Sequence, residues 1–578
     1  MVRGGLLFLA GCLALSGCGT SPMSVDEQVR RMAAEGARRA NLTTSPEPGA
    51  RADLSGTRPA QTNTRPQTRN PGPESLTFTP AAVDRDVTAR LTAIARASGV
   101  PMDGVVAPAN GTEIRALTLE DALRQSQETG REILSAQEAY LLASIDLLIT
   151  RHQWGPRLFN DTTVSVAGQG DDGRFQHTAQ LINRLRVTKR LPFGGSAEAA
   201  WVWNASENLR EQASGRYRQS SGLVLSGNIP LLRGAGLIAR EDLIQGERDL
   251  VYAAREFERF RREYLVSIAS DFFELLNSKA AIANAERQLE SLRQNAARTE
   301  ALVASGRLEG FERDIARSEV LSQEASLAGQ RDQYILQLAR FRVRLGLPES
   351  HAIDVAPTGV NLPEPEADMD QMVLLALDLR LDLQNQRDRL DDRRRQVVNA
   401  RNQLLPDLNL SARATLPTDD DANVGHLDLS PDDADYAVEA TLSLPLDRKE
   451  EALRLRASQI QLQRSLREYE QARDEVIVRV RAALRNIELA RFQLTLAEKQ
   501  VEINERRKRG QELQKDTIDA QRIVDTENSL AASRNQRDRA QTNLRVAVLE
   551  YLLESDQLRV KRDGTIDPPA GMDTVSTP

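Results

Sequence analysis

The sequence predicts an α+β membrane protein in which transmembrane β-strands continue into very long α-helices. Three observations carry this prediction. The body of the chain holds long stretches with neither glycine nor proline, segments of alternating apolar and polar residues lie between them, and the two halves repeat the same order of elements. Apolar residues at three- and four-residue steps are typical of helices, whereas alternation over about ten residues is typical of membrane β-barrels.

The N-terminus carries a predicted targeting signal. Arg3 precedes the apolar run Leu6–Leu15, which is too short to span a bilayer permanently. Leu15-Ser16-Gly17-Cys18 has the lipobox pattern, so residues 1–17 are predicted to be a lipoprotein signal peptide and Cys18 the lipidated residue. An aspartate directly after the lipidated cysteine would favour inner-membrane retention. The residue there is Gly19, which favours the outer membrane. The alternative is an ordinary secretory signal that contains a cysteine by chance.

Cysteine, histidine and charge give no sign of a metal site, a cofactor or a nucleic-acid partner. Cys12 leaves with the signal, so the mature chain holds only Cys18 and forms no internal disulfide. The four histidines lie far apart and lack metal-binding spacing. The net charge of −7 provides no basic field for nucleic acid. Aromatic residues at 4% and charged residues at 28% suit long helices better than a large compact core.

Residues 18–110 are predicted to form a lipidated tether. The stretch Thr43–Pro80 is especially rich in proline, threonine, serine, arginine and glycine. Such a composition buries too little apolar surface to offset the entropy of ordering the chain. Helical turns are expected around Asp26–Arg39 and Asp84–Ala97.

Long helices dominate the rest of the chain. The stretches without glycine or proline are Glu247–Ser305, Ala367–Leu405, Leu446–Arg509 and Gln511–Asp563. A helix of about 70 residues spans roughly 100 Å. Two half-length helices stacked end to end, Leu117–Gln153 and Phe311–Gly346, could lie beside one long helix over Gly236–Ser305. The second half repeats this scheme around Lys449–Arg509.

The β-type segments lie within residues 162–229 and 407–446. Asp407–Leu416 and Tyr436–Leu446 each place apolar residues on one face and polar residues on the other. In the first half, Leu181–Leu191, Ala197–Ser206 and Gln219–Ile229 do the same. This alternation predicts a membrane β-barrel. The alternative is a soluble sheet that packs on one face.

The two halves copy each other around these segments. Pro230 and Pro445 each follow the last strand of a half and precede a long helix, which suits a strand-to-helix junction. Ten residues after Gly306 comes Ala316-Arg317, and ten residues after Gly510 comes Ala520-Gln521. The four elements strand, long helix, turn and helix thus recur in the same order in both halves, which indicates an internal structural repeat.

These features resemble the outer membrane efflux protein family, the TolC-like ducts. The residues that carry the resemblance are Leu405-Pro406-Asp407-Leu408, Pro230–Gly236, Leu345-Gly346-Leu347-Pro348 and Gly510-x5-Asp516-x2-Asp519-Ala520. The resemblance covers about residues 115–555. We therefore assign residues 111–350 to a first repeat, 351–371 to a linker, 372–555 to a second repeat and 556–578 to a polar tail.

The resemblance implies a homotrimer in which each chain gives four strands to a twelve-stranded barrel and its helices to a periplasmic α-helical barrel. It places the turns near Gly306 and Gly510 at the periplasmic tip, where an adaptor protein docks. It also places Asp516 and Asp519 at the tip constriction, whose position in the first half is taken by Glu312. Two aspartates three residues apart share a helix face, so three chains would crowd carboxylates and raise their pKa by mutual repulsion. The alternative for this pair is a solvated helix face.

One departure from the family pattern puts the four-strand count in doubt. Pro156 to Pro230 is about 35 residues longer than Pro406 to Pro445. The extra residues include Leu191-Pro192-Phe193-Gly194-Gly195, a predicted turn. They could form an enlarged external hairpin or additional strands.

Two further motifs are set aside. Gly234-x-Gly236-x-x-Ala239 has the form of a dinucleotide fingerprint, but the long helix that follows leaves no βαβ unit. The acidic segment 419–435 could bind Ca²⁺ but lacks the EF-hand order, so an exposed acidic loop is the simpler interpretation.

The sequence therefore predicts a passive exit duct in the outer membrane, not an enzyme, with no cofactor. It would serve a tripartite efflux pump or a type I secretion system, with a periplasmic adaptor and an inner-membrane pump or export ATPase as partners. The alternative is a coiled-coil lipoprotein without a channel that spaces the outer membrane from the periplasm. That spacer needs the helices but not the alternating strands.

Overall fold

The computed structural model describes residues 22–40, 115–171, 174–208, 218–348, 351–356, 369–418, 429–513, 520–561, 563–564 and 566–567. The chain divides into two compact units. Unit 1 comprises Met1–Pro48, Ala139–Arg255 and Asn385–Gln471, and unit 2 comprises Gly49–Glu138, Glu256–Gln384 and Ala472–Pro578.

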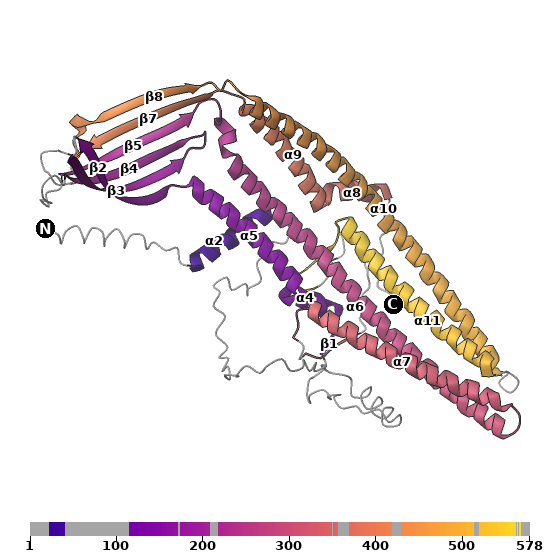
Figure 1. Cartoon of the computed structure of the whole chain (residues 1–578). Coiled ribbons are helices and arrows are strands. Elements are labelled where there is room, and N and C mark those ends of the chain that lie inside the picture. The colour runs from indigo at the N-terminus through magenta and orange to yellow at the C-terminus, as the bar shows by residue number, and fades with distance from the viewer. Residues whose placement is uncertain are drawn as a thin grey trace, which may run out of the picture. The chain divides into compact units, whose positions relative to one another are not determined.

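Helices make up most of the described chain (Figure 1). They are α2 (Pro22–Arg39), α4 (Leu119–Thr129), α5 (Arg131–Trp154), α6 (Glu241–Ala304), α7 (Gly310–Arg344), α8 (Met369–Leu379), α9 (Leu381–Asn402), α10 (Lys449–Leu513) and α11 (Ala520–Glu554). The two longest, α6 and α10, match the long helices that the sequence predicts, and each is followed by a helix of half its length. Among the described helices, α5 alone has the length and composition to cross a membrane, although the core helix of a folded protein passes the same test.

The half-length helices that precede the strands are broken, which the sequence does not predict. Gly130 separates α4 from α5, and Arg380 separates α8 from α9. Gly130 has an extended backbone, and a Cβ atom there would overlap the hydroxyl of Tyr264. Arg380 is fully buried and binds carboxylates, as described below. Both breaks thus lie where the chain makes a close tertiary contact.

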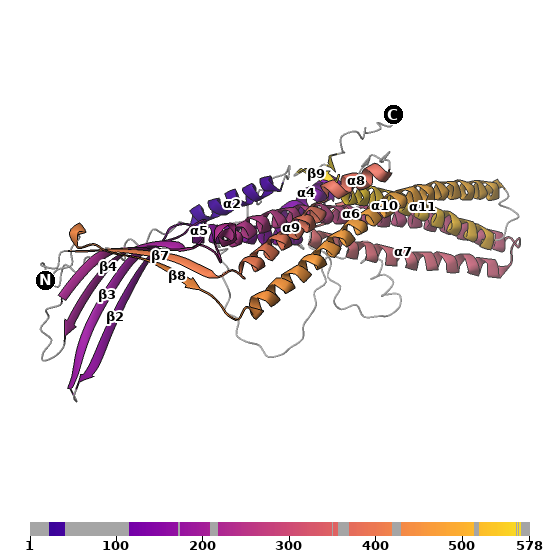
Figure 2. The ribbon, with the colours of Figure 1, turned by 90° about the horizontal axis from the view of Figure 1, so that it is seen from above.

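Six antiparallel strands form one sheet in unit 1, in the order β2-β3-β4-β5-β7-β8 (Figures 1 and 2). They are β2 (Arg157–Asp171), β3 (Arg174–Arg190), β4 (Ser196–Asn208), β5 (Arg218–Pro230), β7 (Asp407–Pro417) and β8 (Asp435–Ser443). The first half of the chain supplies four of these strands and the second half two. The described sheet thus has six strands rather than the four that the resemblance implies, because the extra residues of the first half, whose role the sequence leaves open, form a complete hairpin, β3–β4, in it.

The register of the sheet aligns the apolar positions of all six strands. Leu158 lies opposite Val187, Leu185 opposite Trp201, and Ala414 opposite Tyr436. Because alternate residues of a strand point to opposite faces, these apolar residues share one face of the sheet, which also carries the polar residues Asn160, Thr162 and Asn183. We call it the apolar face; its larger residues are Leu158, Val164, Val166, Leu181, Leu185, Val187, Trp201, Trp203, Leu223, Leu225, Leu408, Leu410, Leu416, Tyr436, Val438 and Leu442.

The opposite face of the sheet, the polar face, carries charged residues in ion pairs. Arg186 contacts Asp161 at 2.7 Å and Glu198 at 3.6 Å, and Arg184 also pairs with Glu198. Arg413 and Glu439 extend this face across β7 and β8. The sheet therefore separates an apolar surface from a charged one.

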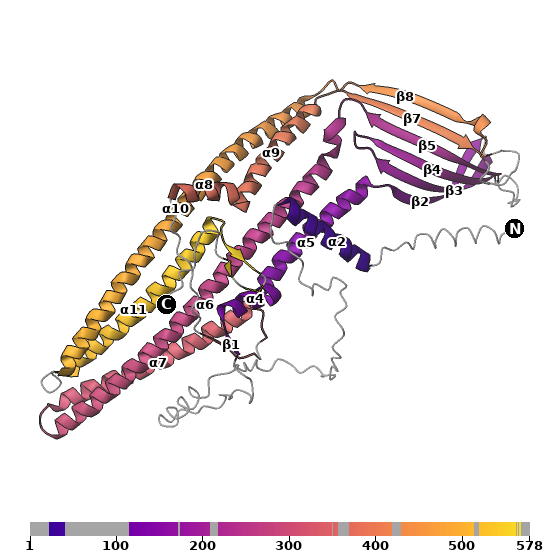
Figure 3. The same cartoon turned by 180° about the vertical axis from the view of Figure 1, so that it is seen from behind.

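The first part of the predicted tether is folded. Helix α2 lies beside α5 within unit 1 in both side views (Figures 1 and 3). The Tyr140 hydroxyl donates to the carbonyl of Ala33, and Arg151 pairs with Glu35 at 3.2 Å. Ala33 and Ala37 are buried. The helical turns expected around Asp26–Arg39 are therefore present as α2, but this part of the predicted tether is docked, because its small residues at helical spacing pack against α5 and α6.

Small strand pairs accompany the helices in unit 2. β1 (Arg115–Leu117) pairs in parallel with β6 (Ile353–Val355), and β9 (Arg559–Val560) pairs antiparallel with β10 (Ile566–Asp567). Phe272 of α6 and Phe341 of α7 are buried, and their ring centroids lie 6.4 Å apart. This core holds the two helices together as a hairpin.

Candidate gating site

The turn between α6 and α7 is one end of a helical hairpin in unit 2. The amide of Arg307 donates to the carbonyl of Leu302 at 2.9 Å, and that of Gly306 to Val303 at 3.0 Å. These two bonds form a Schellman cap, which requires a left-handed residue. Gly306 supplies it with a φ of 72°, and a Cβ atom there would meet nothing within 4 Å. Gly306 is thus needed for the backbone conformation of the turn. The turn is exposed and accessible to a partner.

The second predicted turn is the one near Gly510. Gly510 is inside α10, which continues to Leu513, and α11 begins at Ala520. Gly510 itself is therefore helical, and the turn predicted near it stays a prediction, because residues 514–519 lie outside the described residues. One glycine costs a helix about 1 kcal/mol, which the surrounding arginine, lysine, glutamate and glutamine residues, strong helix formers, offset. Asp516 and Asp519 lie outside the described residues, and their role stays a prediction. So does that of Cys18, which also lies outside them.

Glu312, the first-half counterpart of the acidic positions, lies in the first turn of α7. Its Oε2 atom is buried and has no hydrogen-bond partner among the residues that the structure describes. A negative charge in the first turn of a helix is favoured by the helix dipole. The position is therefore compatible with a carboxylate near the turn.

A row of polar side chains holds α11 against its three neighbouring helices in unit 2. We call it the polar seam; it consists of Asn284, Gln288 and Ser291 of α6, Glu319 of α7, Asn504 and Lys508 of α10, and Glu527, Asn528, Asn535 and Asp538 of α11. Glu527 accepts from Ser291 at 2.7 Å and pairs with Lys508 at 2.7 Å. Asn528 accepts from Gln288 at 2.5 Å and donates to Glu319 at 3.1 Å.

The polar seam differs from the contacts inside a hairpin. Ala285 and Leu289 of α6 pack with Leu327 of α7 in an apolar cluster. Opening such a cluster exposes apolar surface to water, at about 25 cal/mol per Å². A hydrogen bond contributes only about 0.5–1.5 kcal/mol net, because water replaces the lost partner. The polar seam therefore joins α11 to α6 and α7 through hydrogen bonds, whereas this part of the contact between α6 and α7 is apolar.

Glu527→Ala should loosen the polar seam. It removes the acceptor shared by Ser291 and Lys508, and a hydrogen bond to a charged group contributes about 1.5–3 kcal/mol. We expect backbone amides of α11 near residue 527 to exchange with deuterium about tenfold faster or more, since tenfold corresponds to about 1.4 kcal/mol. Glu498→Ala, which removes an exposed carboxylate of α10, is the control. Equal exchange rates in the two variants would contradict a structural role for the seam.

A second polar feature, the buried ion cluster, lies deeper in unit 2. It consists of Glu258, Arg259 and Arg262 of α6, Arg380 and Asp382 at the α8–α9 break, and Glu554 and Asp556 at the end of α11. Arg380 is 0% exposed, pairs with Asp382 at 2.7 Å and also contacts Glu554. Arg262 pairs with Asp556 at 2.8 Å and with Glu258 at 2.9 Å. The cluster joins three segments that are distant in sequence.

The pKa values in the cluster follow from burial and from the arginines. Burial alone would raise the pKa of Glu258, but Arg261 and Arg262 bring it below its usual 4.5. Burial would likewise raise the pKa of Asp382, and Arg380 lowers it below its usual 3.8. Burial dominates at Asp556 and raises its pKa, although Arg262 opposes the shift.

Acid should destabilise the ion cluster. Glu258 and Asp382, with lowered pKa values, contribute stability above their usual values of 4.5 and 3.8, and it is lost as the pH falls through their lower folded-state values. Asp556 acts in the opposite sense. Because its pKa is raised in the folded protein, the folded state binds this proton more readily than the unfolded chain, and protonation of Asp556 at low pH favours folding. With two carboxylates against one, we expect the melting temperature to fall below about pH 4.5. Glu258→Gln should show a shallower fall, and an identical pH profile in wild type and variant would refute the assignment.

The end of α11 corrects the prediction of a polar tail from residue 556. Asp556, Leu558 and Val560 are buried. The Gln557 amide donates to the Leu552 carbonyl at 2.8 Å around Asp556, whose φ is 58°. Two signals in the sequence could have revealed this: the apolar alternation of Leu558 and Val560, and an aspartate directly after an apolar helix end. Arg380, between Leu379 and Leu381, is a similar missed signal.

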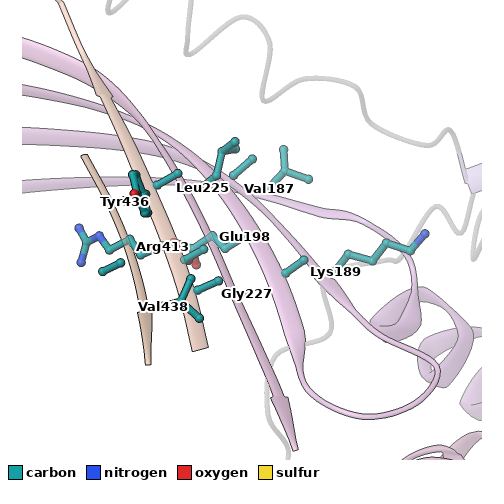
Figure 4. Close-up of a pocket in the computed structure, with 14 residues that line it drawn as sticks. Val187, Lys189, Glu198, Leu225, Gly227, Arg413, Tyr436 and Val438 are labelled. Carbon is teal, nitrogen blue, oxygen red and sulfur yellow. The ribbon is translucent and has the colours of Figure 1, made fainter. Parts of the chain in front are cut away.

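A hollow of about 550 Å³ lies on the sheet of unit 1. Its lining includes the small residues Ala197, Ala199, Gly227, Ala412 and Ala414, and Figure 4 shows larger side chains around it. The lining has no convergent set of nucleophile, base and oxyanion donors such as a catalytic site requires. Among the described residues no group of three or more His, Cys, Asp or Glu side chains could hold a metal ion; residues 419–428 of the acidic segment lie outside them.

Two comparisons show which known proteins this chain is similar to. Residues 373–548, which include β7, β8, α10 and most of α11, match the outer membrane efflux protein family. This part of the chain is therefore similar to the members of that family. The matched segment contains two strands of the sheet, the α10 and α11 sides of the polar seam, and Arg380 and Asp382 of the ion cluster. No curated protein matches the chain.

Solved structures extend the comparison to the remainder of the efflux protein fold. CusC, described as forming a transmembrane channel, matches with a TM-score of 0.57 and 15% identity over 79% of this chain and 96% of its own. The Campylobacter jejuni outer membrane channel CmeC matches at 0.58 and 12%, over 79% and 93%. The outer-membrane channel OprN matches at 0.58 and 16%, over 84% and 98%. The chain therefore has the fold of these channels across both halves.

Proposed function

We propose that this protein is the outer-membrane exit duct of a tripartite efflux pump or type I secretion system, and that it acts as a trimer. The observation that carries the proposal is the apolar face of the six-stranded sheet. Tyr436 is 85% and Val164 73% exposed on it. Large contiguous apolar surfaces of this kind mark contact with lipid or with another protein. The channel fold of the chain favours lipid, and hence localisation in the outer membrane.

The sheet has the composition of a membrane wall. Transmembrane β-strands place apolar residues toward lipid and polar residues toward the lumen, with aromatic residues near the interfaces. The apolar face and the ion-paired polar face follow this rule, and Trp201 and Trp203 lie on the apolar face. The soluble-sheet alternative requires a layer that covers the apolar face, and its exposed residues argue against one.

Two features support assembly from several copies. The edge strands β2 and β8 each have one neighbour within the described chain, and a barrel in lipid must pair such edges. In addition, α10 exposes a stripe of large apolar residues at helical spacing; they are Leu489, Phe492, Leu496 and Ile503. A trimer, which the family resemblance implies, would pair the edge strands β2 and β8 of neighbouring copies and cover the apolar stripe of α10.

The duct is passive and is gated at its periplasmic tip. Its partners are a periplasmic adaptor, which contacts the turns near Gly306 and Gly510, and an inner-membrane pump or export ATPase. Lipid on Cys18 adds a second attachment to the outer membrane. Opening separates α11 from α6 and α7 along the polar seam. The protein performs no chemistry on its cargo, so it is not an enzyme and requires no cofactor.

Asp516→Ala with Asp519→Ala should open the closed duct in planar bilayers. Removing the acidic rings takes away a cation site at the constriction. We expect higher conductance and about tenfold weaker block by Mg²⁺, which corresponds to about 1.4 kcal/mol. Asp525→Ala, an exposed aspartate farther along α11, is the matched control. Unchanged conductance and block in the double variant would contradict the gating role of the pair.

The alternative of a coiled-coil spacer makes a different prediction for membrane extraction. A spacer held by lipid alone leaves the membrane when Cys18 is replaced by serine. A duct with transmembrane strands that reaches the membrane stays there in carbonate and migrates as a heat-modifiable trimer. Carbonate release of a Cys18→Ser chain that keeps a cleavable signal would favour the spacer.

A further inference from the structure

The hairpin β3–β4 has no counterpart in the second half of the chain. In the second half, β7 follows α9 and β8 leads to α10, so two strands connect two helices. In the first half, β2 follows α5 and β5 leads to α6, but β3 and β4 lie between them. The hairpin is thus an insertion into an otherwise repeated unit.

The inserted hairpin is a full part of the wall. Its register with both neighbours is continuous, from Arg157↔Thr188 onward in β2 and from Ser196↔Asn228 onward in β5. It also keeps the alternation of the sheet, since Leu185 and Val187 of β3 and Trp201 of β4 share the apolar face. A plug inside the lumen or a loop outside the membrane would not need this alternation.

The turn of the hairpin is fixed to the junction between strand and helix. The Gly236 amide donates to the Phe193 carbonyl at 2.8 Å, and Arg190 pairs with Asp242 of α6 at 2.8 Å. Gly195 has a φ of 79°, and a Cβ atom there would overlap the carbonyl of Asn228. Close packing and a positive φ both require glycine at this position. The hairpin therefore stays in the wall at its helix-proximal end.

We infer that β3–β4 widens the barrel to eighteen strands, six from each of three chains, and so lets the outer-membrane pore admit cargo too bulky for a twelve-stranded barrel; this rests on the proposed function. The first and last strands of an even-numbered antiparallel sheet run in opposite directions. β8 of one copy can therefore pair antiparallel with β2 of the next, and the ring closes without a parallel mismatch.

The added strands change the width of the pore. Barrel diameter grows roughly in proportion to strand number, so eighteen strands give about 1.5 times the diameter of twelve. Barrels of sixteen to eighteen strands enclose an aqueous channel, whereas eight strands leave an interior filled by side chains. The hairpin thus sets the upper limit on cargo size at the membrane.

Single-particle imaging of the full-length trimer tests the inference, together with a variant that lacks residues 172–217. An Asn-Gly turn would join Asp171 to Arg218, which is the preferred link for a two-residue hairpin. With this link Val164 of β2 lies opposite Leu225 of β5, so the apolar face is kept. Deletion of residues 50–95, a segment of equal length outside the described residues, is the control.

We expect eighteen strands in the wild type and the control, and twelve strands with a barrel about 1.5-fold narrower in the hairpin deletion. A wild-type ring of twelve strands with β3–β4 outside the wall would overturn the inference and leave the duct standing. A wild-type protein without a ring would overturn the proposed function and the inference together. Where the deletion variant does not assemble, the strand count of the wild type alone decides.

Discussion

Replacing Arg380 by methionine is expected to lower the free energy of unfolding by about 3 kcal/mol. Arg380 is fully buried, and its loss leaves Asp382 and Glu554 without their shared partner. Removing one member of a buried ion pair costs about 3–5 kcal/mol, and the lower end applies because both carboxylates keep some access to water. Thermal or urea unfolding of the purified protein measures the loss.

Two further variants make the Arg380 experiment specific. Arg394→Met removes an exposed arginine of α9 that pairs with Asp391, and exposed pairs contribute about 0–1 kcal/mol. Arg380→Met combined with Glu554→Gln should recover part of the loss, because one uncompensated carboxylate becomes neutral. A single variant as stable as wild type would show that the cluster does not hold the three segments together.

Phe492→Asp with Leu496→Asp is expected to prevent trimer formation. Phe492 is 65% and Leu496 55% exposed on α10, as expected of residues that a neighbouring chain covers. Burying such a side chain contributes about 1.5–3 kcal/mol, so the pair supplies about 3–6 kcal/mol at each interface. Two aspartates remove this gain and add charge to a dry contact. Light scattering coupled to size-exclusion chromatography measures the mass of the assembly.

Thr495→Asp provides the control for this stripe. Thr495 is exposed on the same helix but lies off the line formed by Leu489, Phe492, Leu496 and Ile503. The same charge at Thr495 should leave the trimer intact. A double variant that remains trimeric would mean that the stripe faces something other than a second copy of this chain.

Much of the fold could be predicted because it depends on local sequence patterns. The long helices follow from stretches such as Glu247–Ser305 without glycine or proline, and the strands follow from alternation. The strand count required more: proline spacing showed that the first half is longer, but only the register shows that Leu185 and Trp201 share one wall. For α2 the sequence predicts only helical turns. The full helix is stabilised by docking on α5 and α6, and composition alone does not show that contact.

The candidate site was harder to predict because its partners are distant in the chain. Asn284 meets Asn535 and Asp538, and Arg380 meets Glu554, only after the hairpins have packed. From sequence alone, a polar residue of an amphipathic helix is predicted to be solvent-exposed. Only the packed structure shows which helix it contacts. Gly306 could be predicted as a turn because its left-handed cap is local. Gly510 shows that the same residue type is also tolerated inside a helix.

The docking of α2 also changes how the N-terminus can act. With a diacylglycerol on Cys18, as the sequence predicts, three residues separate the acyl chains from Pro22, a reach of about 10–14 Å. The lipid anchor would therefore be attached close to helix α2, which contacts with Tyr140, Arg151 and Glu247 hold in unit 1. Residues 41–114 follow α2 in the chain, so a change in their length would not alter the distance between the fatty acids and unit 1.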